Sequence, residues 1–539
     1  MAPTGPSLSN ALRATTLESA TRAGAHDVVV VGGGASGGLA ALLLAEAGLR
    51  VLLLDAGMPQ PTALPASRRA TNALVRTLAD PSNLRFLPPK LVPMARVGLR
   101  ALGLLHQPVQ SRCGFWGRAP ELYVDDRDCP YVTPPDQPFV WIRTRQLGGK
   151  MTLPGHGRQY YRLGPADFAS TGANGWPLER GELDAWYSQV EKRLKLAGGR
   201  NDIPWQPDSE LERVLTPTAN ERGLMEAITS RWPGARPMLG CFAPPLDSLE
   251  AAAATGRLQC RQGAIAKRID VDSSGRVSGV TWVDQLSGGR EARVSAPLVF
   301  LCASALESTR LLLLSRSSKS PDGLGAASGA LGRNLMDHMI VTGWCSGPAL
   351  PPDHAAEEQR SIYLPRFDAR EQAAPAAAPG FGVQLYQFPG AARESHFVVV
   401  TFGEMPPRPE NRVTLDPSRR DAWGIPVLRI ECGYDSNDLE RARNQGTAIR
   451  ELADALGVKL GRLNDRPTAP GVAIHECGSA RMGADPSSSV LDPHNQCWDA
   501  RGLYVTDGSS FASQGTQNPT LTILALTARA CDHAVSGSR

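Results

Sequence analysis

Residues 27–57, DVVVVGGGASGGLAALLLAEAGLRVLLLDAG, are the stretch that decides the fold. The run Val28–Val31 has the composition of a buried parallel strand and leads directly into a cluster of glycines. A leucine- and alanine-rich helix follows and is predicted to end at Gly48, a residue type favoured just beyond a helix C-terminus. Val51–Leu54 form a second strand that stops at Asp55. This order predicts a β-α-β unit.

The glycines of this unit follow the dinucleotide-binding spacing Gly-x-Gly-x-x-Gly. Gly32 permits the tight turn, Gly34 lets the backbone approach a pyrophosphate, and Gly37 permits close packing of helix on strand. The positive end of the helix dipole is expected to face the phosphates. We also include Ser36 of this turn among the cofactor-binding residues. Asp55 is placed to bond ribose hydroxyls, which disfavours NADP but does not choose between NAD and FAD.

Composition excludes several classes of protein. With 539 residues, 42% of them hydrophobic and 20% charged, the chain is neither disordered nor fibrous. A net charge of +4 is small for this length and gives no sign of a nucleic-acid surface. Glycine and proline make up about 18% of the residues, which predicts many turns and long connections.

The sequence also bears on location and metals. The N-terminus lacks the apolar run of a secretory signal, and no window approaches 18 consecutive apolar residues, so we expect a cytoplasmic protein without a membrane span. Ten scattered cysteines without a Cys-x-x-Cys pair fit reduced thiols. No metal site is expected, because the histidines show no metal-ligand spacing.

The chain after the first unit argues for FAD rather than NAD. A one-domain NAD dehydrogenase would continue with regular β-α repeats, whereas the next 85 residues are rich in proline and contain a predicted amphipathic helix near 91–104. A second glycine turn follows at Gly148 and Gly149.

Further motifs lie in the middle and C-terminal parts of the chain. The central ones are residues 301–314 (LCASALESTRLLLL), 331–338 (LGRNLMDH) and 404–416 (EMPPRPENRVTLD). The C-terminal ones are residues 475–483 (HECGSARMG), 489–492 (SVLD), 502–509 (GLYVTDGS) and 518–522 (NPTLT). Together with the N-terminal unit, these motifs resemble the glucose–methanol–choline (GMC) oxidoreductase family of flavoproteins, in family order over roughly residues 27–535.

The resemblance implies an α/β fold with two interleaved lobes. A Rossmann-like FAD-binding domain would combine residues 25–150, 236–340 and 471–535. A substrate-binding α+β domain would combine residues 151–235 and 341–470, with an antiparallel sheet as one wall of the substrate cavity.

The residue pattern supports several individual elements of these lobes. Strands are predicted at 258–261, 266–271, 277–283, 299–301, 381–388, 396–402, 412–415, 427–432 and 503–505, and helices at 305–314 and 435–456.

In the family, two side chains face the reactive edge of the flavin. The resemblance places His475 and Asn518 there: His475 as the general base that takes the hydroxyl proton, and Asn518 as the amide that orients the substrate oxygen. The carbinol hydrogen would leave as hydride toward flavin N5, and a neutral imidazole suits the base role near pH 7. Asn518 precedes Pro519 and a helix-like run, so a helix cap is the competing interpretation, although one residue can fill both roles.

The resemblance implies further contacts to FAD. Gly148 and Gly149 would lie near the flavin, Ala266 near the adenine edge, and Asp507 and Gly508 near the pyrophosphate and ribityl chain.

Other residues bear on how the flavin is attached. Some family members attach FAD covalently through a histidine at the position of Leu153, so non-covalent FAD is favoured here, with His156 as a less favoured attachment site. His338 is interpreted as structural.

The function implied is FAD-dependent oxidation of a CH–OH group of a sugar, glycoside, polyol or other alcohol to a carbonyl, with O₂ or another electron acceptor. The resemblance is greatest to bacterial sugar or alcohol dehydrogenases and to pyranose-oxidase-like members. The alternative is a non-redox enzyme on the same fold, such as a hydroxynitrile lyase or a flavin photodecarboxylase. The sequence leaves open the substrate, the choice between oxidase and dehydrogenase, and the oligomeric state.

Overall fold

The structure of the protein is a computed structural model. It describes residues 12, 15–59, 94, 106–156, 158–168, 175–200, 203, 205–244, 246–348, 360–372, 379–389 and 394–537. The helix predicted near 91–104 lies, apart from Met94, outside the described residues.

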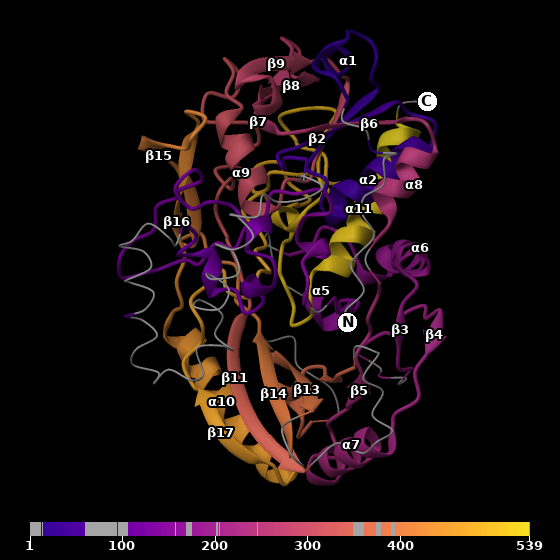
Figure 1. The fold of residues 1–539 in the computed structure, drawn as a ribbon, viewed down its shortest axis with the longest axis vertical. Helices are drawn as coiled ribbons and strands as arrows, with labels where there is room; N and C mark the ends of the chain where they lie inside the picture. Colours follow the sequence, from indigo (N-terminus) through magenta and orange to yellow (C-terminus); the bar gives the residue numbers. More distant parts are fainter. Residues whose placement is uncertain are drawn as a thin grey trace, which may run out of the picture.

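A five-stranded parallel sheet forms the centre of the upper lobe in Figure 1. Its strand order is β18-β10-β1-β2-β6, so strands from widely separated parts of the chain lie side by side. The strands are β1 (Val28–Val31), β2 (Val51–Asp55), β6 (Leu258–Gln262), β10 (Leu298–Leu301) and β18 (Leu503–Val505). In register, Val28 pairs with Val51 on one side and with Leu298 on the other. Every residue of β1 and β2 is buried, as their continuous apolar runs predict.

Helices pack beside this sheet. They are α2 (Ala35–Glu46), α8 (Ser248–Ala254), α9 (Ala305–Leu314) and α11 (Thr520–Ser536). Helix α2 contacts both α8 and α11, and Gly48 just beyond its end has a φ of +96°, which fits its predicted role. The predicted β-α-β unit is therefore present, with the helix beginning at Ala35 directly after Gly34.

A three-stranded antiparallel sheet adjoins the parallel one. It consists of β7 (Ala264–Val271), β8 (Val277–Asp284) and β9 (Arg290–Val294). The hairpin between β7 and β8 was predicted from its turn residues, and Gly275 in that turn has a φ of +87°.

The lower lobe in Figure 1 is built on a six-stranded antiparallel sheet of order β17-β11-β14-β13-β12-β5. Its strands are β5 (Met238–Leu239), β11 (Met339–Pro348), β12 (Ile362–Leu364), β13 (Phe381–Pro389), β14 (Glu394–Gly403) and β17 (Lys459–Asn464). Helix α10 (Ser436–Ala455) packs on this sheet, close to the predicted range 435–456, and begins with a capping box of Asp435 and Asp438. Helix α7 (Ala219–Arg231) contacts α10.

Two predicted strands do not belong to that sheet. β15 (Arg412–Arg420) and β16 (Pro426–Glu431) pair with each other in a separate two-stranded ladder. Their inward side chains Val413, Leu428 and Ile430 pack with Phe139 and Trp141. The expectation that they extend the substrate-cavity wall is therefore wrong, because their apolar face is used against another part of the chain.

The remaining elements are short or peripheral. They are α1 (Leu17–Thr21), α5 (Pro165–Phe168), α6 (Asp184–Leu194), β3 (Ala197–Gly198) and β4 (Arg213–Val214). Among the described residues, no helix combines the length and apolarity that crossing a membrane requires.

Candidate active site

A cavity of about 470 Å³ extends from the glycine turn of the upper lobe to the antiparallel sheet of the lower lobe. Gly32, Gly34 and Asp55 line one region of it, and His475 and Asn518 line another. The lining therefore combines residues predicted to bind a dinucleotide with residues predicted to act on a substrate.

The first glycine turn is held in shape by Asp55. The Asp55 carboxylate accepts hydrogen bonds from the Gly33 and Gly57 backbone N–H groups at 2.8 and 2.7 Å. Gly32 has a φ of +95°, a conformation that favours glycine. A Cβ at Gly37 would lie 1.8 Å from the Gly32 carbonyl oxygen, so helix α2 approaches the turn more closely than any side chain permits. The turn and the helix N-terminus form a backbone cradle that fits a pyrophosphate.

The second glycine turn packs directly against the first. The Gly148 N–H donates to the Gly33 carbonyl at 2.8 Å. Both Gly148 and Gly149 have positive φ, and a Cβ at Gly149 would lie 3.1 Å from the Gly34 Cα. Gly149 lines the cavity. The structure thus brings both predicted glycine turns to one place, where two backbone segments enclose the cofactor region.

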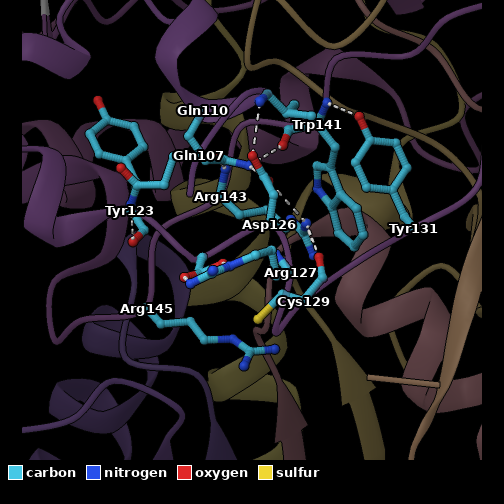
Figure 2. Close-up of polar contacts among 12 residues, drawn as sticks. Gln107, Gln110, Tyr123, Asp126, Arg127, Cys129, Tyr131, Trp141, Arg143 and Arg145 are labelled. Atoms are coloured by element: carbon cyan, nitrogen blue, oxygen red, sulfur yellow. Dashed lines mark hydrogen bonds and ion pairs between the residues drawn. The ribbon is translucent and has the colours of Figure 1, made fainter. Parts of the chain in front are cut away.

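Two arginines on the cavity wall were missed in the sequence. Arg143, six per cent exposed, stacks over the Trp141 ring at 4.1 Å and donates through Nη2 to the Cys129 carbonyl at 2.5 Å (Figure 2). Its Nε, and Nη1 of Arg145, are buried with no hydrogen-bond partner among the described residues. Asp126 and Glu307 lie 3.9 and 3.7 Å from the Nη2 atoms of Arg143 and Arg145. The two N–H groups that keep no hydrogen-bond partner fit an anionic ligand such as a diphosphate. The Arg-x-Arg pair directly before the second glycine turn was the available signal.

The loop that carries His475 is held by a buried carboxylate. Asp337 accepts from the backbone N–H groups of Gly471 at 2.6 Å, Ala473 at 3.3 Å and His475 at 3.1 Å. Burial, together with repulsion from Glu476, raises the pKa of Asp337 to about 7. Ile474, directly before His475, has a φ of +63°, which is strained for a β-branched residue. The backbone at His475 is therefore fixed by its surroundings rather than by its own preference.

The His475 ring lies between two polar side chains. Its Nδ1 is 2.8 Å from Nδ1 of His338, and its Nε2 is 3.3 Å from Nδ2 of Asn518. Burial, and then the positive charge that His338, His156 or Lys150 would add, lower the pKa of His475 well below the ordinary histidine value. The structure thus joins His475 and Asn518, 43 residues apart, and keeps the imidazole neutral near pH 7.

Asn518 does not cap the following helix. Helix α11 begins at Thr520, with Pro519 at the cap position and no side-chain cap bond. The Asn518 Oδ1 instead accepts from Nε2 of Gln384 on β13 at 2.7 Å, which turns the amide nitrogen toward His475. The competing interpretation of Asn518 as a helix cap is therefore wrong.

The other predicted cofactor residues lie on or behind the cavity wall. Ala266, Asp507, Gly508 and Ser36 line it. The Ser36 hydroxyl donates to the Thr506 carbonyl at 3.1 Å, so its backbone N–H is the group left for a phosphate. The Asp507 carboxylate accepts from the Ser308 hydroxyl and, at 3.0 Å, from the Ser509 N–H.

The two positions discussed for covalent attachment differ in their access to the cavity, since His156 lines it and Leu153 does not. Leu153 is buried in an apolar cluster with Trp116, Val140 and Ile142. His156 lines the cavity, meets Phe115 edge-on at 5.6 Å, and has its pKa lowered to about 4 mainly by burial. Among the described residues, no group of three or more metal-binding side chains occurs.

This fold and site define a dinucleotide-dependent oxidoreductase in which a second lobe closes the substrate end of the cavity. The comparisons name the family. The GMC oxidoreductase description matches residues 246–340 and 407–527, and a description of FAD-dependent oxidoreductases matches residues 27–133. The chain belongs to the GMC oxidoreductase family, and its cofactor is FAD.

Relatives and solved structures agree with this assignment. The 2-methyl-1,2-propanediol dehydrogenase of Mycolicibacterium austroafricanum is 28% identical, over 74% of this chain and 83% of its own. The paromamine 6′-oxidase of Streptomyces fradiae is 28% identical, over 95% and 91%. The pyridoxine 4-oxidase structure from Mesorbium loti shares the fold, with a TM-score of 0.57 and 21% identity over 94% and 99%. These relatives support a redox enzyme and give no support to the lyase or photodecarboxylase alternative.

Proposed function

We propose that this FAD-dependent enzyme oxidises a CH–OH group of a sugar, glycoside, polyol or related alcohol to a carbonyl at His475 and Asn518. The observation that carries the proposal is the convergence of His475 Nε2 and Asn518 Nδ2 at 3.3 Å on the wall of the cofactor cavity. FAD, when bound, supplies the acceptor for the carbinol hydrogen.

The two side chains have complementary roles toward a hydroxyl group. Neutral His475 presents a nitrogen lone pair that takes the hydroxyl proton as the C–H bond breaks. The Asn518 amide donates to the substrate oxygen and holds it against His475, since its own oxygen is already bonded to Gln384. Positioning one hydroxyl between the two groups also aligns its carbon for transfer.

The substrate side of the cavity favours an uncharged polar molecule. Gln384 and Tyr386 of β13 line it, and their hydrogen-bonded amide and phenol groups make this part of the wall polar but uncharged. Ile340 and Phe402 add apolar surface beside them. The 2-methyl-1,2-propanediol dehydrogenase among the relatives supports the same substrate class.

The proposal extends to domains, FAD attachment and location. We propose that residues 25–150, 236–340 and 471–535 bind FAD non-covalently and that residues 151–235 and 341–470 bind substrate. The reduced flavin then passes its electrons to O₂ or another acceptor. A cytoplasmic location is supported by the ten cysteines, all of which are free and buried.

Anaerobic mixing of the FAD-loaded enzyme with a panel of sugars, glycosides, polyols and aliphatic alcohols tests the function. We expect at least one class to bleach the oxidised flavin absorbance, because hydride transfer reduces the flavin. Admission of air, and separately of a quinone, then identifies the acceptor. Substrate turnover without bleaching would contradict the proposal and restore the non-redox alternative.

The pH dependence of flavin reduction follows from the environment of His475. The base must be unprotonated, so the rate falls as pH drops through the folded-state pKa, which is lowered well below 6.5. We therefore expect the limiting reduction rate, measured by anaerobic stopped flow, to stay constant from about pH 8 to 6.5 and to fall only in more acidic solution. A decline that begins at or above pH 7 would show that another group controls the proton transfer.

A further inference from the structure

We propose that His338 is a positioning residue that fixes which ring nitrogen of His475 carries the proton. The inference rests on the proposed role of His475 as the base and goes beyond it, since sequence analysis assigned His338 only a structural role. His338 directly precedes β11 and is completely buried, and both of its ring nitrogens have partners.

The assignment of protons starts at a backbone carbonyl. Nε2 of His338 is 2.9 Å from the Gly515 carbonyl oxygen, which only accepts, so Nε2 carries a proton. Burial lowers the pKa of His338 to about 4, so the ring is neutral near pH 7 and its Nδ1 is an acceptor. The group 2.8 Å from that nitrogen, Nδ1 of His475, must therefore donate.

The proton on Nδ1 of His475 decides the state of its other ring nitrogen, Nε2. A neutral imidazole with its proton on Nδ1 has a lone pair on Nε2, which is the nitrogen beside Asn518. Without this fixed partner, the imidazole would also populate the tautomer with Nε2 protonated, which cannot take a proton from substrate. His338 thus selects the tautomer that a base at Nε2 requires.

The Asn518 side agrees with this assignment independently. Gln384 accepts at Oε1 from the Tyr386 hydroxyl at 2.7 Å and from Gln159 at 2.9 Å, so its Nε2 is the end that donates to Asn518. Asn518 in turn presents its NH₂ to His475, which requires an acceptor at Nε2. The two hydrogen-bond chains, read from opposite ends, assign the same tautomer.

The geometry also restrains the ring in space. The His338 and His475 rings meet at 84° with centroids 5.0 Å apart, and Phe402 meets His338 edge-on at 5.8 Å. Asp337, the residue before His338, holds the His475 backbone N–H. Two consecutive residues therefore position both the main chain and the ring of His475.

The tautomer is directly measurable by long-range ¹H–¹⁵N correlation spectra of FAD-loaded enzyme labelled at histidine nitrogens. A His475→Gln variant assigns the His475 signals among the nine histidines. We expect His475 to be protonated at Nδ1 and unprotonated at Nε2 near pH 7. A His475 protonated at Nε2 in the unmodified enzyme would overturn the proposal, whatever its activity.

Two polar variants separate positioning from packing. In His338→Gln the longer amide reaches the Gly515 carbonyl but leaves no acceptor at the Nδ1 position, whereas His338→Asn places an amide oxygen near that position. We expect His338→Gln to lower the limiting rate of flavin reduction about 10- to 100-fold with little change in substrate Kd, and to mix the His475 tautomers. His338→Asn should restore the Nδ1–H tautomer and most of the rate.

The outcomes distinguish the inference from the proposed function. Substrate turnover without flavin bleaching would contradict the proposed function itself, whereas a normal rate of flavin reduction in His475→Ala would contradict only the role of His475 as the base. If His475→Ala is impaired but His338→Gln keeps the normal rate and tautomer, only the role of His338 fails. Equal losses in the Gln and Asn variants with an unchanged tautomer would show a packing role and would likewise overturn the inference.

Discussion

Replacement of His475 by alanine is expected to lower the rate of flavin reduction by about 10²–10⁴ while FAD remains bound. The ring is the proposed proton acceptor, and its removal leaves the Asn518 amide facing a void. FAD binding should persist, because the glycine turns and Asp55 lie elsewhere on the cavity wall. Anaerobic stopped-flow reduction with the best reductant of the panel gives the rate, and the visible absorbance gives the FAD content.

Two comparisons make the His475→Ala result specific. His494 stacks on His533 at 4.2 Å, and neither histidine lines the cavity, so His494→Ala should keep the rate within about twofold. Added imidazole should recover part of the lost rate in His475→Ala by entering the space the ring has left. A normal reduction rate in His475→Ala would refute its role as the base.

The parts of the fold that sequence reasoning located correctly are local ones. The unit from Val28 to Asp55 was predicted because strand, glycine turn, helix and acid follow one another within 30 residues. Which strands share a sheet was harder to predict from the sequence. β15 and β16 have the same alternating character as β13 and β14, and only their contacts with Phe139 and Trp141 decide that they pair separately.

The residues of the candidate site also differ in whether the sequence could predict them. His475 and Asn518 were found through motifs, yet no pattern in the sequence indicated that His338 meets His475, 137 residues further along. That contact depends on β11 and the loop before α11 arriving at one point. Arg143 and Arg145 are an intermediate case, since they stand beside a recognised glycine turn but show their unpaired N–H groups only when their burial is known.

The Gly37→Ala substitution is expected to weaken FAD binding by about 5- to 150-fold. The new methyl group would lie 1.8 Å from the Gly32 carbonyl oxygen, a backbone atom that yields only if the turn or the helix moves. Overpacking of this kind costs about 1–3 kcal/mol, and each 1.4 kcal/mol directed at the cofactor site is tenfold in affinity. Calorimetric titration of the apoprotein with FAD measures the loss.

The neighbouring glycine provides the matched control for this prediction. Gly38 lies in the same helix, but a Cβ there would meet only side-chain atoms of Leu249 and Ser248, at the ordinary contact distances of 3.6 and 3.7 Å. Replacing either glycine by alanine favours the helix by the same free energy, about 1 kcal/mol. Gly38→Ala should therefore bind FAD normally and melt at an equal or higher temperature, while Gly37→Ala binds FAD more weakly. Equal FAD affinity in the two variants would show that the close approach of helix α2 to Gly32 is not what shapes the cofactor site.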